Sequence, residues 1–354
     1  MPDGGCTREP LRAGAAGVDM LPAQLRVERS RMAVTTTRYL VTGGAGFIGS
    51  HLVRRLLAIG GTVRVVDNLS TGSLANLAAV RDEIDFVEGD LAEHGVAERA
   101  VEGSDVVFHL AARGSVPRSL ADAWGSHDAN VNATVRLLEA ARHGGVRRVV
   151  FSSSSSVYGD TPTLPKVESV EPLPRSPYAA SKLSGEQYVL AYAHAGLVEG
   201  VALRYFNVFG PRQSPDGAYA AVIPLFMHAA LAGTRARLFG DGSQTRDFTY
   251  VDNVVDANLR AATVSREQAS GWVVNVGAGG RTSLRELLTL VEQVSGRSIA
   301  VDEHPPRGGD VRDSLAGLER ATQLLGYTPT VSVRDGLART WEWFEQQPGV
   351  SNPA

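Results

Sequence analysis

The chain contains almost no cysteine and almost no lysine. Its 354 residues include a single cysteine, Cys6, which excludes an intramolecular disulfide and a metal site built on cysteines. Among the 35 lysine and arginine residues, the only lysines are Lys166 and Lys182. A guanidinium does not replace an ammonium at every functional position, so this bias favours a role for a retained lysine. The alternative is that both survived by drift.

Long apolar runs and an excess of charge are also missing. No segment approaches the ~20 apolar residues needed to cross a membrane, and residues 1–37 lack the apolar core of a signal peptide. The net charge is −3, which offers no basic footprint for nucleic acid. We therefore expect a cytoplasmic protein that binds neither a membrane nor nucleic acid and carries no metal.

From Arg38 onward, strand-like and helix-like segments alternate. Apolar spacing predicts helices over 46–61 and 130–145. Short apolar runs predict strands over residues 38–43, 62–68, 84–90, 104–112, 146–154, 201–210 and 271–277. This alternation is typical of an α/β fold with βαβ units and a doubly wound parallel sheet.

The first strand-to-helix turn, "TGGAGFIGS", places Gly43, Gly46 and Gly49 in G-x-x-G-x-x-G spacing. Backbone N–H groups and the helix dipole at such a turn can hold a pyrophosphate. Asp67 ends the next strand 18 residues after Gly49, where its carboxylate can accept from both ribose hydroxyls and repel a 2′-phosphate. The glycine turn and Asp67 together favour NAD over NADP. The alternative is an ordinary tight turn beside a solvated aspartate.

A second motif, "SPYAASK", spans 176–182. Ser176 can cap a helix whose first residue is Pro177, and Tyr178 and Lys182, four residues apart, then share one helix face. A phenol that acts as a base near neutrality needs its pKa of about 10 lowered. The lysine ammonium, the positive nicotinamide ring and the helix N-terminus all act in that direction.

Five consecutive serines, 152–156, follow the predicted strand "VRRVVF". They therefore begin at the carboxyl end of a sheet strand, where such folds bind ligands. A flexible serine linker is the alternative, but buried β-branched residues and "VYG" flank this run.

The motifs together resemble the extended short-chain dehydrogenase/reductase family, specifically its nucleotide-sugar 4-epimerases, over about residues 38–345. The resemblance rests on "TGGAGFIGSHL", "VVDNLSTG", "GDL", "FHLAA", "SSSSVYGD", "SPYAASK", "RYFNVFGPRQ", "GDGSQTRDFTYVDN" and "RGGDVRDS". It implies a Rossmann-type NAD-binding domain over 38–205 and a smaller substrate lobe over 206–345, with a strand near 272–276 returning to the main sheet. Residues 1–37 and 346–354 are expected to be tails, with Met32 as a possible true start.

The resemblance also implies the site residues. Ser154, 24 residues before Tyr178, would be the catalytic hydroxyl beside Tyr178 and Lys182, and Lys182 would hold the nicotinamide ribose. NAD would be bordered by Gly43, Gly46, Phe47, Ile48, Gly49, Asp67, Asn68, Ser70, Thr71, Gly72, Asp90, Leu91, Leu110, Ala111, Ala112, Tyr178, Lys182 and Phe206. A UDP-sugar would contact Ser115, Arg118, Ser154, Tyr178, Asn207, Val222, Leu238, Arg246, Arg307, Asp310 and Ser314. Surface salt bridges are the alternative role for the arginines.

The neighbours of Ser154 indicate the reaction. Related dehydratases carry an Asp-Glu pair directly after this serine and related decarboxylases keep the Glu, whereas this chain has Ser155 and Ser156, which do not titrate near neutral pH. Epimerisation at C4 of a UDP-hexose, with NAD retained, is therefore expected. The alternatives are a UDP-glucuronate 4-epimerase, for which Arg118 is the candidate cation, and a non-catalytic NAD-binding regulatory protein.

Ser314 bears on the choice of sugar. In the family, this position lies beside the C2 substituent and is a tyrosine in epimerases restricted to glucose and galactose. Serine leaves room for an N-acetyl group, so UDP-N-acetylglucosamine and UDP-N-acetylgalactosamine are the expected pair, with the non-acetylated pair weaker. The alternative is that Ser314 merely turns the chain. The resemblance further implies a homodimer built on a helix bundle.

Overall fold

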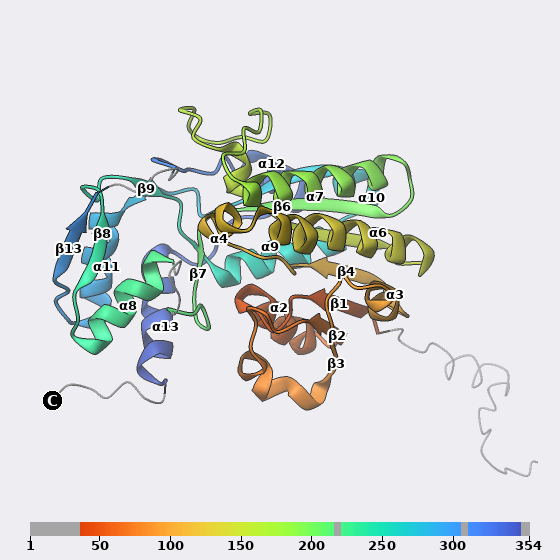
Figure 1. Ribbon diagram of the computed structural model, residues 1–354, viewed down its shortest axis with the longest axis horizontal. Helices are drawn as coiled ribbons and strands as arrows, with labels where there is room; N and C mark the ends of the chain where they lie inside the picture. The colour runs from red at the N-terminus through yellow and green to blue at the C-terminus, as the bar shows by residue number, and fades with distance from the viewer. Residues whose placement is uncertain (1–35, 216–220, 306–310, 348–354) are drawn as a thin grey trace, which may run out of the picture. The chain divides into compact units, whose positions relative to one another are not determined.

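Seven parallel strands form the central sheet of the computed structural model, which describes residues 36–215, 221–305 and 311–347 (Figure 1). Their order across the sheet is β11-β6-β5-β4-β1-β2-β3. The strands are β1 (Arg38–Thr42), β2 (Thr62–Asp67), β3 (Ile84–Glu88), β4 (Val106–His109), β5 (Arg148–Ser154), β6 (Glu199–Tyr205) and β11 (Trp272–Val276). The order reverses between β1 and β4, which makes the sheet doubly wound and Rossmann-type, as predicted.

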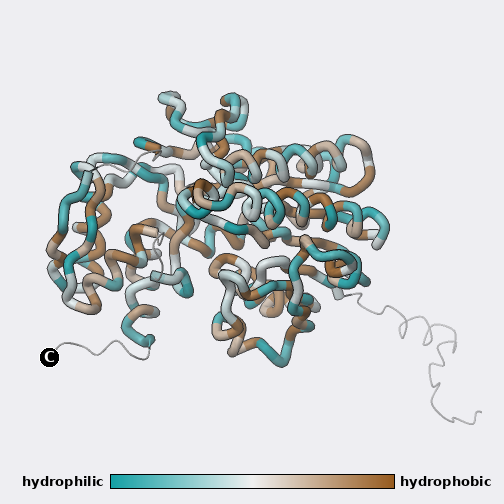
Figure 2. Tube along the Cα trace, viewed as in Figure 1, coloured by the Kyte–Doolittle hydropathy of each residue, from teal (hydrophilic) through white to brown (hydrophobic). Residues whose placement is uncertain are grey.

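Helices cover both faces of this sheet. One face carries α2 (Phe47–Ala58), α9 (Val251–Thr263) and α12 (Glu319–Leu325), and the other carries α3 (Val96–Val101), α6 (Ala133–His143) and α7 (Pro177–His194). Successive strand residues point to opposite faces, so Val41 packs in the first of these cores and Leu40 in the second. Hydrophobic and hydrophilic residues alternate around the helix coils in Figure 2 because each helix buries only one side.

The predicted strand over 201–210 is interrupted. Strand β6 ends at Tyr205, and after two residues the short β7 (Val208–Phe209) pairs with β10 (Thr249–Tyr250) away from the main sheet. The break falls at Asn207, whose φ is 26°, outside the extended region that a strand requires. Asparagine is among the few residues that tolerate a positive φ, so its identity permits this turn out of the sheet.

The carboxyl-terminal part builds a smaller lobe with its own core. Its helices are α8 (Val222–Ala232), α11 (Leu284–Ser295) and α13 (Val333–Glu345), and strands β8 (Ala236–Phe239) and β13 (Val301–His304) pair in parallel. Strand β9 (Thr245–Arg246) pairs with β12 (Thr282–Ser283). Between these elements the chain returns to the main sheet as β11, which pairs with β6.

The remaining elements are short and lie in the connections. They are η1 (Leu74–Glu83), α4 (Val116–Ala121), α5 (Ala123–His127), η2 (Asp128–Asn132), η3 (Ser155–Tyr158) and α10 (Arg266–Ala269). Within the described ranges, no helix is both long and apolar enough to cross a membrane. The two expected tails, 1–37 and 346–354, fall almost wholly outside the described residues, as do Arg307 and Asp310.

Candidate active site

A cavity of about 1250 Å³ opens along the carboxyl edge of the central sheet. The loops that follow β1 to β6 form one wall, and segments of the smaller lobe form the other. The structure brings most of the sequence-predicted residues to this cavity: Gly43, Gly46, Phe47, Ile48, Gly49, Asp67, Asn68, Ser70, Thr71, Asp90, Leu91, Leu110, Ala111, Ala112, Ser115, Arg118, Ser154, Tyr178, Lys182, Phe206, Asn207, Arg246 and Ser314.

The glycine turn lets the backbone approach the cavity closely. Gly43 has a φ of 68°, and a Cβ there would lie 2.7 Å from the backbone nitrogen of Ala111. A Cβ on Gly49 would lie 2.2 Å from the carbonyl oxygen of Gly43. Gly46 caps α2 without a side-chain hydrogen bond, so the first-turn N–H groups of α2 face the cavity with no side chain covering them. Such a turn suits a bound diphosphate.

Asp67, at the end of β2, is held by the backbone on both sides of it. Its Oδ2 accepts from the N–H of Ala45 at 2.9 Å, and its Oδ1 accepts from the N–H of Leu69 at 2.9 Å. Burial raises the pKa of this carboxyl, while the two N–H donors lower it. Each oxygen keeps a lone pair for a ribose hydroxyl, which is the geometry expected for NAD.

Gly72 is one correction to the predicted cofactor contacts. It does not line the cavity; instead, a Cβ at this position would lie 3.0 Å from both carboxylate oxygens of Asp67. Its contribution is therefore the absence of a side chain over Asp67. The neighbouring Asn68 does line the cavity, and its Nδ2 donates to Asp90 Oδ2 at 2.7 Å, which joins the loops after β2 and β3.

Helix α7 begins as the sequence predicts. The Oγ of Ser176 accepts from the N–H of Ala179 at 3.1 Å, and Pro177 is the first helical residue. Tyr178 therefore lies in the first turn, near Ser154, whose side chain lowers the pKa of Tyr178. Burial is the larger effect and raises that pKa.

Lys182 lies one turn further along α7 and is 3% exposed. Its Nζ donates to the carbonyl oxygen of Ser152 at 2.7 Å and lies 5.1 Å from the centre of the Phe151 ring. Burial lowers the pKa of Lys182 to about 7. We expected the Lys182 ammonium to lower the pKa of Tyr178. In the structure that lowering comes from Ser154, and the chain alone leaves the pKa of Tyr178 raised.

A buried lysine with a depressed pKa opposes folding, which gives a testable stability effect. Between pH 7 and 10.5 the unfolded chain binds more protons than the folded one, so the penalty is full below about pH 7 and shrinks as the pH rises. Lys182→Met should therefore raise the melting temperature of the NAD-free protein, more at pH 6 than at pH 9. Arg136→Met, an exposed cation on α6, is the control and should show no such difference. An equal shift at both pH values would contradict the depressed pKa.

The smaller lobe presents polar groups to the far end of the cavity. The Nδ2 of Asn207 donates to the Ser314 Oγ at 3.0 Å, and the N–H of Asp247 donates to the same oxygen at 3.3 Å. Arg246 Nη1 donates to the backbone oxygens of Thr245 and Arg312 at 3.0 and 2.9 Å, which fixes the guanidinium beside the cavity. These contacts gather one cation, one amide and one hydroxyl at this end.

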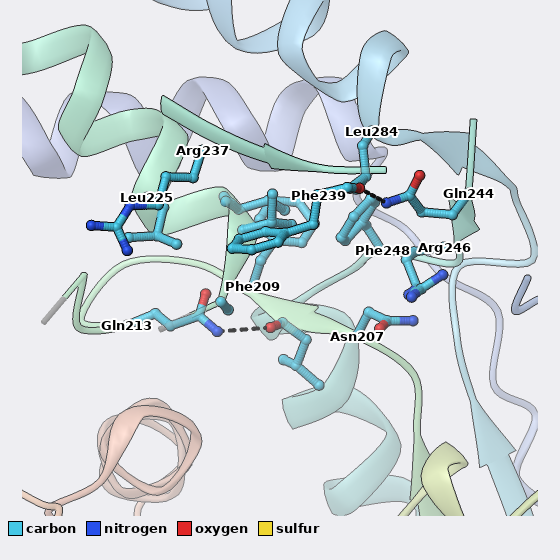
Figure 3. A pocket seen from close by; sticks show the side chains of 14 residues that line it. Asn207, Phe209, Gln213, Leu225, Arg237, Phe239, Gln244, Arg246, Phe248 and Leu284 are labelled. Carbon is cyan, nitrogen blue, oxygen red and sulfur yellow. Dashed lines mark hydrogen bonds between the residues drawn. The ribbon is translucent and has the colours of Figure 1, made fainter. Parts of the chain in front are cut away.

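A recess of about 250 Å³ adjoins the cavity and shares Asn207 and Arg246 with it. Figure 3 shows the rings of Phe209, Phe239 and Phe248 gathered around the recess, with Arg246 at its edge. Aromatic and apolar walls next to a cation suit a planar base attached to phosphates.

Two predicted substrate contacts have different outcomes at this recess. Val222 lines it, but Leu238 lines neither the recess nor the larger cavity. Leu238 is 1% exposed and belongs to the core of the smaller lobe, because side chains alternate along β8. Its neighbours Arg237 and Phe239 are the residues that face the recess.

Sequence reasoning missed several polar residues around the cavity. Asp247 accepts from the N–H groups of Ala278, Gly279 and Ala316 and so ties together segments distant in the sequence. His109 lies between Thr42 and Thr134, and burial with the nearby Lys182 charge lowers its pKa to about 3. In the described part of the chain, no group of three or more histidine, cysteine, aspartate or glutamate residues is arranged to hold a metal.

A Rossmann-type sheet with a serine, a tyrosine and a lysine beside the cavity at its carboxyl edge is the arrangement of an enzyme that uses a dinucleotide cofactor. Residues 39–277 match the model of the NAD dependent epimerase/dehydratase family, and the chain belongs to that family. It is 44% identical over 314 residues to a UDP-glucose 4-epimerase of Mycolicibacterium smegmatis, which covers 88% of this chain and 99% of the relative.

Solved structures of epimerases share the fold. A UDP-N-acetylglucosamine 4-epimerase from Methanobrevibacter ruminantium is 38% identical with a TM-score of 0.82, covering 88% of this chain and 98% of the other. A UDP-glucose 4-epimerase from Thermotoga maritima is 38% identical with a TM-score of 0.83, covering 88% and 99%. The predicted family and its cofactor, NAD, are thereby confirmed.

Proposed function

We propose that this NAD-dependent UDP-sugar 4-epimerase acts preferentially on UDP-N-acetylglucosamine and UDP-N-acetylgalactosamine, with UDP-glucose and UDP-galactose as weaker substrates. The gathering of Ser154, Tyr178 and Lys182 on the wall of one cavity at the carboxyl edge of the sheet carries the assignment to C4 redox chemistry. Ser314, a small residue at the far end of the cavity, supports the preference for the acetylated pair.

The absence of nearby acids supports epimerisation over dehydration. Among the described residues that line the cavity, the carboxylates are Asp67 and Asp90. Asp67 is the last residue of β2 and Asp90 follows β3, so both lie at the cofactor end. Ser155 and Ser156 line the cavity beside Ser154, and the Ser156 Oγ donates to the Ser154 Oγ at 2.9 Å. Removing water from C5 and C6 needs an acid and a base at these positions, and hydroxyls supply neither.

The reaction uses three side chains of the nicotinamide end. Tyr178 takes the proton of the sugar 4-hydroxyl while Ser154 hydrogen-bonds the 4-oxygen, and Lys182 holds the ribose. NAD, when bound, would supply the acceptor and the donor of the C4 hydride, and Tyr178 would return its proton to the 4-oxygen when the 4-ketose is reduced on its opposite face. Because the same hydride returns, the cycle consumes no second substrate.

The sugar must turn over between the two hydride transfers while the nucleotide stays bound. The recess lined by Phe239 and Phe248 would hold the base, and Arg246 would bind the pyrophosphate bidentately. Anchoring at this end leaves the hexose free to rotate within the larger cavity.

One experiment separates the candidate substrates. Purified enzyme, without added NAD, is incubated separately with UDP-glucose, UDP-N-acetylglucosamine and UDP-glucuronate, and the products are identified. We expect the fastest conversion with UDP-N-acetylglucosamine. Faster conversion of UDP-glucuronate would favour the alternative, in which Arg118 on the cavity wall binds the sugar carboxylate. No conversion of any of the three would contradict the assignment.

A further inference from the structure

A buried asparagine joins three segments around the sugar end of the cavity. Asn275, near the end of β11, is 0% exposed and does not line the cavity. Its Oδ1 accepts from the hydroxyl of Tyr158 at 2.7 Å, and its Nδ2 donates to the carbonyl oxygens of Lys166 and Gly317 at 2.8 and 3.3 Å. Both N–H groups and the oxygen of this amide are therefore used.

One partner of Asn275, Lys166, lines the cavity, and the other two lie in segments that carry the cavity-lining residues Ser154 and Ser314. Tyr158 is the last residue of η3, the short helix that directly follows Ser154. Lys166 lines the cavity and forms a β-bridge with Ala316: its N–H donates to Leu315 O at 2.7 Å. Gly317 returns a bond to Lys166 O at 2.8 Å, and Ser314 lies three residues earlier in the same segment.

The tyrosine end of this connection is itself fixed. The Arg204 guanidinium lies 4.6 Å from the centre of the Tyr158 ring, and Arg204 is paired with Glu186 at 2.6 Å. Glu186 also accepts from the Ser153 Oγ at 2.9 Å. Tyr158 is thereby linked through Arg204 and Glu186 to Ser153, the residue before Ser154.

The chain from Ser314 to Gly317, at the other end of this connection, is also tightly packed. A Cβ on Gly317 would lie 2.6 Å from Val167 Cγ1, and a Cβ on Gly277 would lie 2.5 Å from Ala316 Cβ. On its other side the segment is bound by Asp247, which accepts from Ala316 N at 3.0 Å. The main-chain position of Ser314 is therefore set from both sides.

We infer that Asn275 is a positioning residue: through Tyr158 and Gly317 it sets the separation between the Ser154 hydroxyl and the Ser314 wall, and thereby the binding of the hexose. The inference rests on the proposed function, since it assumes that the sugar lies between these two walls. The three hydrogen-bond partners of the Asn275 side chain are Tyr158, Lys166 and Gly317, and none of them lines the aromatic recess or belongs to the glycine turn. Loss of the connection should weaken binding of the sugar and leave binding of UDP and NAD unchanged.

Tyr158→Phe removes one hydroxyl and keeps the packed ring, and Asn275→Ala removes the whole connection. Both should raise the KM for the UDP-sugar by about tenfold, as expected for a misplaced polar wall, with kcat falling by less than about threefold. The Kd of UDP alone and the NAD content should stay at wild-type values. In the double variant the two effects should be less than additive, because the Tyr158–Asn275 hydrogen bond is already lost in each single variant.

Tyr327→Phe is the matched control. Its hydroxyl is equally buried and donates to Gly277 O at 2.8 Å, two residues after Asn275, and no hydrogen bond joins Tyr327 to Tyr158, Lys166 or Gly317. A lower melting temperature with an unchanged KM is expected there. Wild-type KM in Tyr158→Phe, or an equal loss of UDP binding, would overturn the inference while leaving the proposed function intact. A wild-type enzyme that converts no UDP-sugar would overturn both.

Discussion

Tyr178→Phe should lower turnover by about 10²- to 10⁴-fold, the range typical of a lost general base. The phenylalanine ring fills the same space, so the loss isolates the phenol oxygen that Ser154 contacts. The structure also shows why this oxygen depends on its surroundings: burial raises the pKa of Tyr178, and Lys182, whose own pKa is lowered to about 7, contacts Ser152 instead. The remaining push toward phenolate would come from the N-terminus of α7 and from the positive nicotinamide ring of bound NAD.

The measurement is the rate of UDP-sugar epimerisation together with the NAD content of the purified variant. NAD should remain bound, because the glycine turn and Asp67 are untouched. Tyr188→Phe serves as control: this tyrosine is on the same helix, is 42% exposed, and should keep wild-type turnover. Turnover of Tyr178→Phe near the wild-type rate would remove Tyr178 from the proton transfer.

Local patterns were sufficient to predict the class of fold. The predicted strands appear in one parallel sheet, and Ser176 caps α7 as expected, because apolar spacing and capping are properties of adjacent residues. Ser154 and Tyr178, 24 residues apart in the sequence, meet because β5 ends at the sheet edge where α7 begins.

The wrong predictions and the missed residues are those whose roles depend on tertiary contacts. Leu238 was predicted to contact the substrate, but its side chain packs in the core of the smaller lobe. Strand β8 has only four residues, which is too few for the sequence to show which of its side chains face the core. Asn275 was missed because its partner Tyr158 lies 117 residues away. A buried amide of this kind belongs to no sequence motif, because its role arises only when two distant segments meet in the folded chain.

Ser314→Tyr should reduce turnover of UDP-N-acetylglucosamine by at least about 100-fold and change turnover of UDP-glucose by less than about threefold, because steric exclusion can exceed the ~1–3 kcal/mol of a missing methylene. Ser314 lines the cavity with only 6% of its surface exposed, so a tyrosine ring has the cavity as its open direction. There it would occupy the space that an acetamido group needs. The hydroxyl at C2 of glucose is smaller and requires less of that space.

The design separates size from hydrogen bonding. Ser314→Ala removes the oxygen that accepts from Asn207 and Asp247 but adds no bulk, so it should keep a preference for the acetylated sugar. Retained UDP-glucose turnover in Ser314→Tyr also reports that the variant is folded and binds NAD. The measurement is kcat and KM for both substrates in the wild type, Ser314→Tyr and Ser314→Ala. If turnover of both substrates falls equally in Ser314→Tyr while Ser314→Ala keeps wild-type turnover, Ser314 does not select the sugar, and its hydrogen bonds with Asn207 and Asp247 are not needed for activity.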